Sequence, residues 1–234
     1  MRTETFSDGS TRTFVTRADG VQIVTIRDAF GQVQRRTRID ADGRAVVLID
    51  DTRRFEPIDV TTLPRPTASD LAYRDATNLA DLRKVLKAAE ARDLGRSFSL
   101  NQVREYQEVR DLAPEINLDN ITFQTNSAAI QPSEAEQLRE IGLLMVDYIA
   151  ENPREVFLIE GYTDAIGDES YNLLLSDRRA ETVALALSEY FGVRGENMVV
   201  QGYGERFPLV PTLEAERLNR RVAVRRITGL IQPR

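Results

Sequence analysis

Two charged side chains in the second half of the chain have the types and the spacing to hold a small charged ligand. Asp164 follows an apolar segment at 156–159 and a glycine-containing turn, and Arg179 lies on the long amphipathic segment after Gly167. A carboxylate at a strand end and a guanidinium on the following helix can converge on one pocket. Such a pair suits a zwitterion, which carries both an ammonium and a carboxylate.

The same residues also allow structural interpretations. Asp164 and Arg179 could pair with each other at the surface, an interaction worth about 0–1 kcal/mol. Asn172 could make a hydrogen bond in the first turn of its helix, and Ser176 could bond back to its own helix. Residue types alone leave both interpretations open.

The composition of the chain excludes several kinds of site. The 234 residues include no Cys and no His, which excludes disulfides, thiol nucleophiles, Cys/His zinc sites and His-based triads. We therefore expect no metal and no cofactor. The net charge of −6 arises after residue 65, because the first 65 residues carry eleven bases and ten acids. An acidic main domain is a poor host for phosphates, so no nucleic acid is expected as a partner.

Residues 1–52 are predicted to form a small all-β module. Four glycines recur at spacings of 11, 11 and 12, mostly in Asp-Gly turns, namely Gly9, Gly20, Gly31 and Gly43. The β-branched segments between these turns predict a four-stranded meander or a short stack of repeats. Arg35, Arg36 and Arg38 would place charge on both faces of one strand, unlike a membrane-barrel strand. We interpret the module as a spacer whose open edges could pair with envelope proteins or with another copy.

Residues 53–116 are predicted to be a linker followed by a helical connector. Three prolines between 53 and 68 indicate an extended linker. A first helix is expected to begin at Asn78 and stop at Gly95, and a second to open at a Ser99–Gln102 capping box and close at Pro114. The expected apolar faces are Leu79, Leu82, Leu86 and Ala89 in the first helix and Leu100, Val103 and Tyr106 in the second.

Residues 117–234 alternate between strand and helix signals. We expect strands at 119–124, 155–160, 198–203 and 219–227, a helix opening at a Ser133–Glu136 capping box, a long helix after Gly167 and a short helix ending at Leu218. The helix faces expected in the core are Leu138, Ile141, Met145 and Ile149, then Leu175, Ala180, Val183, Ala184 and Leu187. The almost wholly apolar strand at 155–160 indicates a central strand covered on both faces. The predicted class is therefore α+β, with a β/α/β/α/β-β domain after the β module and connector.

Four motifs of this last part together resemble the OmpA-like domain family. They are G-Y-T-D-x-x-G at 161–167, Y-N-x-x-L-S-x-x-R-A at 171–180, Q-G-Y-G-E at 201–205 and N-R-R-V at 219–222. Each motif is short, but their common order and spacing are specific. The resemblance covers about residues 117–234, and the N-terminal half does not resemble the barrel of outer membrane protein A.

The resemblance implies non-covalent binding of peptidoglycan through the meso-diaminopimelate of its stem peptide. In that family the Asp of the G-x-T-D turn takes the ammonium of this residue and the Arg of R-A takes its carboxylate. These positions are Asp164 and Arg179 here, which agrees with the zwitterion site inferred from the residues. The further site residues that the resemblance implies are Thr163, Asn126, Asn172 and Arg220. A role for Arg220 in a structural ion pair stays equally open, and Arg221 is expected to be structural.

Two positions depart from the family pattern. Tyr162 stands where the family usually has His, and Gln124 stands where it commonly has Asp. We expect little loss from Tyr162, because it keeps a flat side chain that can form hydrogen bonds, and a weakened interaction behind the first loop from Gln124.

Two other classes of function are compatible with the residues. A wall-cleaving enzyme would need two carboxyl groups around a sugar cleft, for example Glu160 with Asp164 or Asp168, and we expect no enzyme. A scaffolding protein would act through contacts of the β module. The family implies a periplasmic place at the outer membrane of a Gram-negative bacterium. No segment is long and apolar enough to span a bilayer as a helix, so any anchor is expected upstream of Met1.

Overall fold

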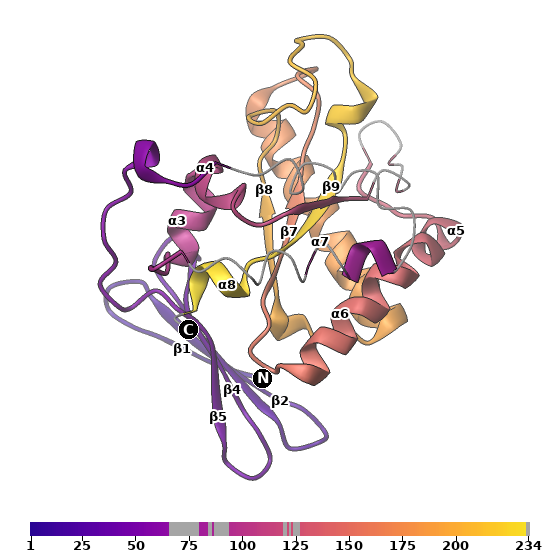
Figure 1. Cartoon of the computed structure of the whole chain (residues 1–234). Helices are drawn as coiled ribbons and strands as arrows, with labels where there is room; N and C mark the ends of the chain where they lie inside the picture. Colours follow the sequence, from indigo (N-terminus) through magenta and orange to yellow (C-terminus); the bar gives the residue numbers. More distant parts are fainter. Residues whose placement is uncertain are drawn as a thin grey trace.

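The chain folds around two β-sheets, shown in a computed structural model that describes residues 1–65, 80–83, 86, 94–118, 121, 123 and 127–232. An N-terminal five-stranded sheet has the order β1-β2-β3-β4-β5, and a C-terminal four-stranded sheet has the order β6-β9-β7-β8 (Figure 1). The predicted α+β class is confirmed.

The elements are bounded as follows. The strands are β1 Arg2–Thr5, β2 Thr11–Thr16, β3 Gln22–Arg27, β4 Val33–Ile39, β5 Ala45–Asp50, β6 Glu115–Asn117, β7 Phe157–Gly161, β8 Met198–Gly202 and β9 Val222–Arg226. The α-helices are α3 Leu100–Glu105, α4 Gln107–Arg110, α5 Pro132–Ala135, α6 Arg139–Glu151, α7 Glu169–Phe191 and α8 Thr228–Ile231. The 3-10 turns are η1 Val60–Thr62, η3 Glu136–Leu138, η4 Gly195–Asn197 and η5 Arg217–Asn219.

The N-terminal sheet is an antiparallel meander with five strands rather than the four expected. The additional strand is β1, which pairs with β2 through Arg2–Phe14 to Thr5–Thr11. Four similar turns connect the strands, each with its glycine at a φ between 81° and 84°. In the first turn Phe6 N–H donates to Ser10 C=O at 2.9 Å and Gly9 N–H donates to Phe6 C=O at 3.0 Å. Glycine is favoured there because this backbone conformation strains other residues.

The first strand of the C-terminal sheet lies earlier than predicted. It spans Glu115–Asn117, whereas Ile121 and Phe123 are not in a strand and the rest of 119–124 lies outside the described residues. Three residues of β9 pair with it, and just beyond them Leu118 N–H donates to Val222 C=O at 2.9 Å. Beyond them, Ile121 N–H donates to Leu118 C=O at 2.9 Å, and this turn ends the pairing.

The helices of the C-terminal half bury the predicted faces but begin differently. The capping box joins Gln131 and Glu134, not Ser133 and Glu136, because Pro132 occupies the first helical turn. All nine side chains expected in the two helix cores are buried. The predicted short helix at Leu218 is only a 3-10 turn. Helix α7 has Asp168 as its N-cap.

The connector helix breaks at Tyr106. The Ser99–Gln102 capping box is confirmed, but Tyr106 ends α3 and begins α4 with an extended backbone. Its side chain is 39% exposed, so its predicted place on the apolar face was wrong. Of the earlier predicted helix, Leu82 and Leu86 are helical and contribute to the core, while Asn78, Leu79 and Ala89 lie outside the described residues.

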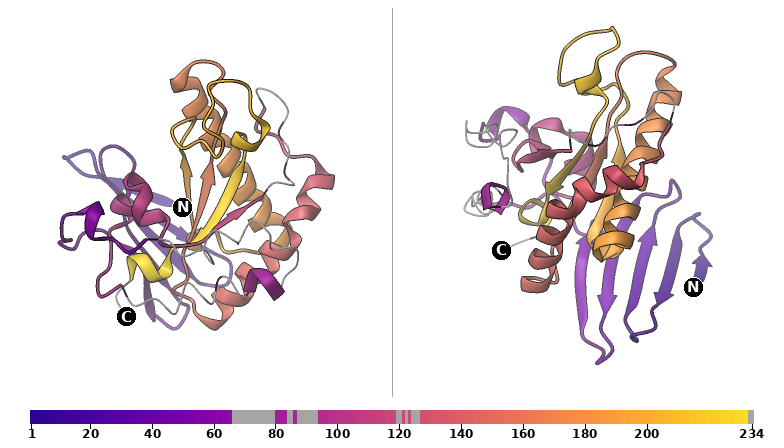
Figure 2. Two further views of the ribbon diagram at one scale, coloured as in Figure 1. Left: turned by 45° about the horizontal axis from the view of Figure 1, so that its top comes forward. Right: turned by 90° about the vertical axis from the view of Figure 1, so that its right-hand side faces the viewer.

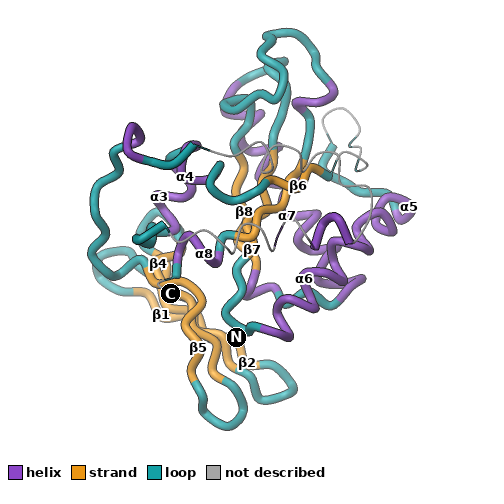
Figure 3. Tube along the Cα trace, in the orientation of Figure 1, coloured by secondary structure: helices purple, strands orange, loops and turns teal. Residues whose placement is uncertain are grey.

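The four-stranded sheet is covered on both faces, as its apolar strand predicted. Helices α6 and α7 lie on one side and α3, α4 and α8 on the other, with the meander below (Figures 1 and 2). Phe157 and Ile159 of β7 face the first group. Leu158, from the opposite face, shares a cluster with Leu48 and Ile49 of β5. Figure 3 shows the strands of the meander at the lower left of those of the four-stranded sheet, with α8 between the two groups in this view.

Helix α7 approaches the sheet most closely at two glycines. Gly161 and Gly202 are direct partners in the parallel β7–β8 ladder. A Cβ atom on Gly161 would lie 2.0 Å from the Ser176 carbonyl oxygen, and one on Gly202 would lie 2.4 Å from the Asp177 nitrogen. Glycine at both positions therefore allows the helix backbone to rest on the strand ends.

We expect Gly161→Ala to lower the free energy of unfolding by about 3 kcal/mol or more, because the new methyl group meets helix backbone that cannot move alone. The matched control is Gly195→Ala, where a Cβ atom meets nothing within 4 Å. Urea unfolding of both variants measures the difference. Equal stability of the two variants would show that α7 can shift without cost.

Candidate functional site

The predicted ligand turn continues directly from the end of β7. Thr163 N–H donates to Gly204 C=O at 2.9 Å, and Tyr162 N–H donates to Arg221 C=O at 2.9 Å. The turn is thus held between the segments that follow β8 and precede β9. Asp164, at its end, is only 8% exposed.

Three charged side chains meet at this turn. Asp164 accepts a hydrogen bond from Arg220 Nη1 at 2.6 Å. Arg179 is 1% exposed, and burial lowers the pKa of its guanidinium, with Arg220 adding to the shift and Asp164 opposing it. The ion pair at this turn joins Asp164 to Arg220, and the predicted grouping of Asp164 with Arg179 stays a prediction.

Arg179 is held by contacts from a segment earlier in the chain. Its Nε donates to the Ser127 carbonyl at 3.1 Å, and its guanidinium lies 4.9 Å from the centre of the Phe123 ring. These contacts fix the direction of the guanidinium before any ligand arrives. Asn126, which was predicted to line the same pocket, lies outside the described residues.

The side chain of Asn172 forms hydrogen bonds to the loops around the site. Its side-chain nitrogen donates to Ile166 C=O at 3.2 Å and to Glu205 Oε2 at 2.7 Å, and lies 3.4 Å from Asp164 C=O. Being 3% exposed, it connects the Asp164 turn with the loop after β8. The role of Glu205 was not anticipated, although it is the last residue of the Q-G-Y-G-E motif.

The hydroxyl groups of Ser176 and Thr163, both near the site, differ in their hydrogen bonds. Ser176 donates to Leu173 C=O at 2.7 Å and accepts from Gly204 N–H at 2.8 Å, so it does bond back to its own helix. The Thr163 hydroxyl is buried and has no hydrogen-bond partner among the described residues.

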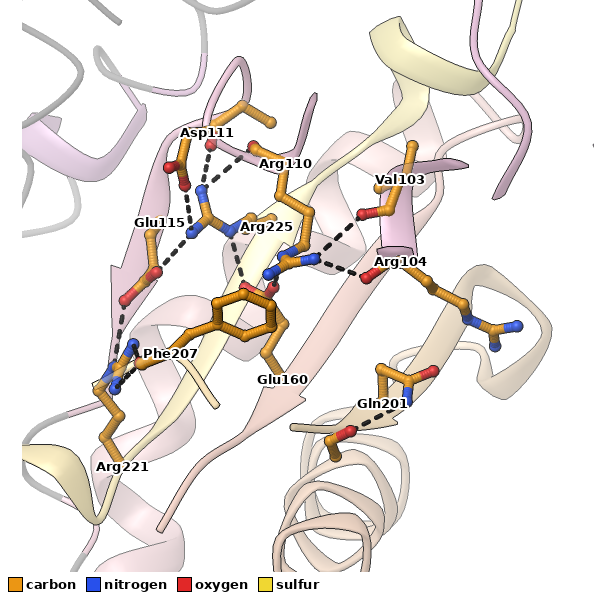
Figure 4. Close-up of polar contacts among 12 residues, drawn as sticks. Val103, Arg104, Arg110, Asp111, Glu115, Glu160, Gln201, Phe207, Arg221 and Arg225 are labelled. Atoms are coloured by element: carbon orange, nitrogen blue, oxygen red, sulfur yellow. Dashed lines mark hydrogen bonds and ion pairs between the residues drawn. The ribbon is translucent and has the colours of Figure 1, made fainter. Parts of the chain in front are cut away.

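Beneath the turn lies a buried charge cluster that sequence reasoning missed (Figure 4). Glu160 is fully buried, and its carboxylate lies 2.7 Å from Arg225 Nε and 3.3 Å from Arg110 Nε. Arg225 also pairs with Asp111 at 3.2 Å and Glu115 at 2.5 Å. Burial is the main cause that raises the pKa of the Glu160 carboxyl, and the nearby Glu115 raises it further. The positive charges of Arg225 and Arg110 oppose this shift. The cluster joins the connector helix α4 to strands β6, β7 and β9.

Aromatic rings pack against the arginines of this cluster. The Arg221 guanidinium lies 3.7 Å from the centre of the Tyr162 ring, and Tyr162 stacks on Tyr203 at 5.5 Å. Arg110 lies 4.2 Å from the Tyr203 ring and 4.4 Å from the Phe207 ring. Tyr162 is only 2% exposed, so the residue that departs from the family pattern belongs to the core beside the site. Arg221 is structural, as expected.

The described residues give no sign of a metal site or a membrane-spanning helix. No group of three or more acidic side chains within the described ranges is arranged to hold a metal ion. Among the helices of those same ranges, none combines the length and the apolar character that crossing a bilayer requires.

The strand–helix order and the charged turn between β7 and α7 define the C-terminal half as an OmpA-like domain. Comparison with known proteins agrees, since residues 122–221 match the profile described as OmpA family. The outer-membrane lipoprotein YfiB of Pseudomonas aeruginosa is 35% identical over 50% of this chain and 68% of its own length. The chain belongs to the OmpA family.

Three further similar proteins align with parts of this chain. The probable lipoprotein YiaD of Escherichia coli is 33% identical over 45% of this chain and 47% of its own length. The peptidoglycan-associated lipoprotein of Burkholderia pseudomallei has a solved structure, 29% identical over 45% of this chain and 86% of that one, with a TM-score of 0.38. The chain thus spans about half of YiaD, and 23% of outer membrane porin F of P. aeruginosa.

We expect Glu160→Gln to destabilise the protein by about 3 kcal/mol, because it leaves buried arginines without their shared counter-charge. The control is Glu151→Gln, which makes the same change at an exposed position and should stay within about 0.5 kcal/mol of the unchanged protein. Chemical denaturation measures both. An unchanged stability of Glu160→Gln would mean that water reaches the cluster.

Proposed function

We propose that residues 117–234 bind peptidoglycan non-covalently and recognise the free ammonium and carboxylate of meso-diaminopimelate. The observation that carries this proposal is a largely buried carboxylate, Asp164, in an ion pair with Arg220 at the turn after β7, together with the buried guanidinium of Arg179 that Ser127 holds. Membership of the OmpA family and the four motifs support peptidoglycan as the ligand.

The charges of the site suit a zwitterion. Arg179 is 1% exposed, so the ligand carboxylate would reach its guanidinium only after the partly exposed Arg220 side chain has moved aside. The guanidinium can then donate two parallel hydrogen bonds. The ligand ammonium would meet Asp164 in place of Arg220. The side chain of Arg220 is 35% exposed and that of Asp164 only 10%, so Arg220 can move into solvent while the ligand ammonium takes over as the counter-charge of the buried carboxylate.

The neutral residues of the site divide into two roles. Asn172 already donates to protein acceptors, so we assign it to holding the Asp164 turn in shape. The Thr163 hydroxyl, which lacks a hydrogen-bond partner among the described residues, is the better candidate for contact with the ligand. Asn126 remains a proposed lining residue on the strength of the motif resemblance.

The geometry favours binding over catalysis. Glu160, the carboxylate that a wall-cleaving enzyme would have needed beside Asp164, is 0% exposed and lies between two arginines. A general acid must reach the glycosidic oxygen, which a sealed side chain does not. Two of the relatives are named as an outer-membrane lipoprotein and an outer membrane porin, and we propose the same envelope location for this chain, on the periplasmic side where the wall lies.

Co-sedimentation with purified peptidoglycan of the diaminopimelate type tests wall binding. We expect the unchanged protein to pellet with the wall, and Asp164→Asn and Arg179→Gln to remain mostly in the supernatant. Losing one charged hydrogen bond of this kind weakens binding by roughly tenfold or more. Thermal unfolding of each variant checks that it is folded.

Two control variants make the same charge changes outside the site. Asp168→Asn removes an acid four residues from Asp164 while keeping a side chain that can cap α7. Arg178→Gln removes the exposed base next to Arg179. Both should pellet as the unchanged protein does. If all variants pellet equally, the wall contact lies elsewhere, and if none pellets, the scaffolding alternative through protein contacts is favoured.

Recognition of diaminopimelate itself predicts a difference between wall types. Peptidoglycan with lysine at the third stem position lacks the second carboxylate, so Arg179 would have no partner in it. We expect binding to such a wall to be weaker by about tenfold or more, and Arg179→Gln to abolish most of the difference. Equal binding of the unchanged protein to both walls would retain peptidoglycan binding and reject the diaminopimelate assignment.

A further inference from the structure

The two edges of the N-terminal sheet differ in their contacts with the rest of the chain. At the β5 edge, Gln232 Nε2 donates to the Leu48 carbonyl at 3.1 Å, and the segment after β5 turns into contact with α3. At the other edge, β1 lies at the periphery of the molecule, next to the N-terminus, with no described strand beyond it (Figure 2, right). The outer edge of β1 is therefore the one where the sheet can be extended.

The hydrogen bonds between β1 and β2 show which backbone groups of β1 point away from the sheet. In an antiparallel pair every second residue bonds to the neighbouring strand. Phe6 N–H donates to Ser10 C=O at the first turn, so Glu4 and Arg2 also exchange backbone hydrogen bonds with β2. The N–H and C=O groups of Thr3 and Thr5 consequently face the open edge. Such unpaired groups form a template for another strand.

We propose that this edge pairs with β1 of a second copy of the chain, antiparallel and with Thr3 opposite Thr3 of the second copy. In this register Arg2 of each copy lies opposite Glu4 of the other, on the same face of the sheet. The outward backbone groups of the two Thr3 residues bond to each other, and Thr5 bonds to Met1. Within one chain Arg2 already pairs with Glu4, and Arg12 lies 3.9 Å from Glu4. The symmetric arrangement adds an oppositely charged neighbour across the interface for each of Arg2 and Glu4, while the outward backbone groups find partners.

The neighbouring registers bring like charges together. A shift of two residues in one direction places Glu4 opposite Glu4, and a shift in the other places Arg2 opposite Arg2. Like charges directly opposite each other destabilise an antiparallel pair. The alternation of Arg2 and Glu4 therefore favours one register, whereas a row of charges of one sign would oppose all of them.

The opposite face of the sheet supports the same register. Thr3 pairs with Thr13 across β1 and β2, with their hydroxyl oxygens 3.4 Å apart, and Thr13 pairs with Thr25 of β3. Placing Thr3 opposite Thr3 of the second copy continues this row of threonines through the interface. β-Branched residues favour such cross-strand pairs.

The first test is the oligomeric state of the full chain by sedimentation equilibrium over a wide range of concentrations. We expect a weak, reversible dimer, since the interface is one short strand. Thr3→Pro should give a monomer, because it removes an outward N–H without removing a hydrogen bond to β2. A protein that is monomeric throughout, or a Thr3→Pro dimer as tight as the original, overturns the proposal.

A charge-swap experiment tests the register. Arg2→Glu and Glu4→Arg each place like charges opposite one another in a homodimer, and each should weaken self-association by about tenfold or more. Mixing the two variants brings opposite charges together again and should restore association. The double variant Arg2→Glu/Glu4→Arg should also dimerise as the unchanged protein does.

The control for the charge swap is Arg44→Glu, an equal charge change at an exposed turn at the far side of the meander. It should leave dimerisation unchanged. Because Arg2 and Glu4 side chains are 74% and 30% exposed, the variants should fold, which circular dichroism checks. Failure of the mixture to associate more strongly than either variant alone rejects this register. Neither result depends on wall binding, which is assayed separately.

Discussion

The close contact between helix α7 and the ends of β7 and β8 is the constraint on which the site depends. Gly161 and Gly202 lie side by side, and any side chain there would collide with the helix backbone. With both Cβ atoms absent, Asp177 accepts from Gly202 N–H and Ser176 accepts from Gly204 N–H. The helix is thereby fixed along its axis, and so is the position from which Arg179 donates to the Ser127 carbonyl.

The opposite face of the same sheet carries a different kind of restraint. Three acidic and three basic side chains are gathered there, and Arg110 reaches Glu160 from the connector helix. A buried ion cluster adds little net stability over apolar packing, but it penalises any arrangement that separates its members. Glu160 is four residues before Asp164 in the chain. The connector and the meander therefore help to hold the strand from which the ligand turn extends.

The candidate site combines one buried and one partly exposed arginine. Arg179 is buried and held by Ser127 and Phe123, whereas Arg220 lies in a partly exposed bridge to Asp164. In this structure Arg220 supplies the counter-charge of the buried Asp164 carboxylate. The next residue of the N-R-R-V motif, Arg221, instead lies over the Tyr162 ring of the aromatic stack.

The sequence alone determined the α+β class and the buried faces of the two long helices, because local periodicity and turn glycines carry that information. It did not determine what depends on contacts between distant segments. The pairing of Asp164 with Arg220, the anchoring of Arg179 by Ser127 and the burial of Glu160 between Arg110 and Arg225 join residues dozens of positions apart. The start of β6 at Glu115 was missed for the same reason, since its length is set by its partners in β9. Only the tertiary fold decides such partners, because strand pairing and buried charge pairing are chosen by three-dimensional proximity and not by spacing along the chain.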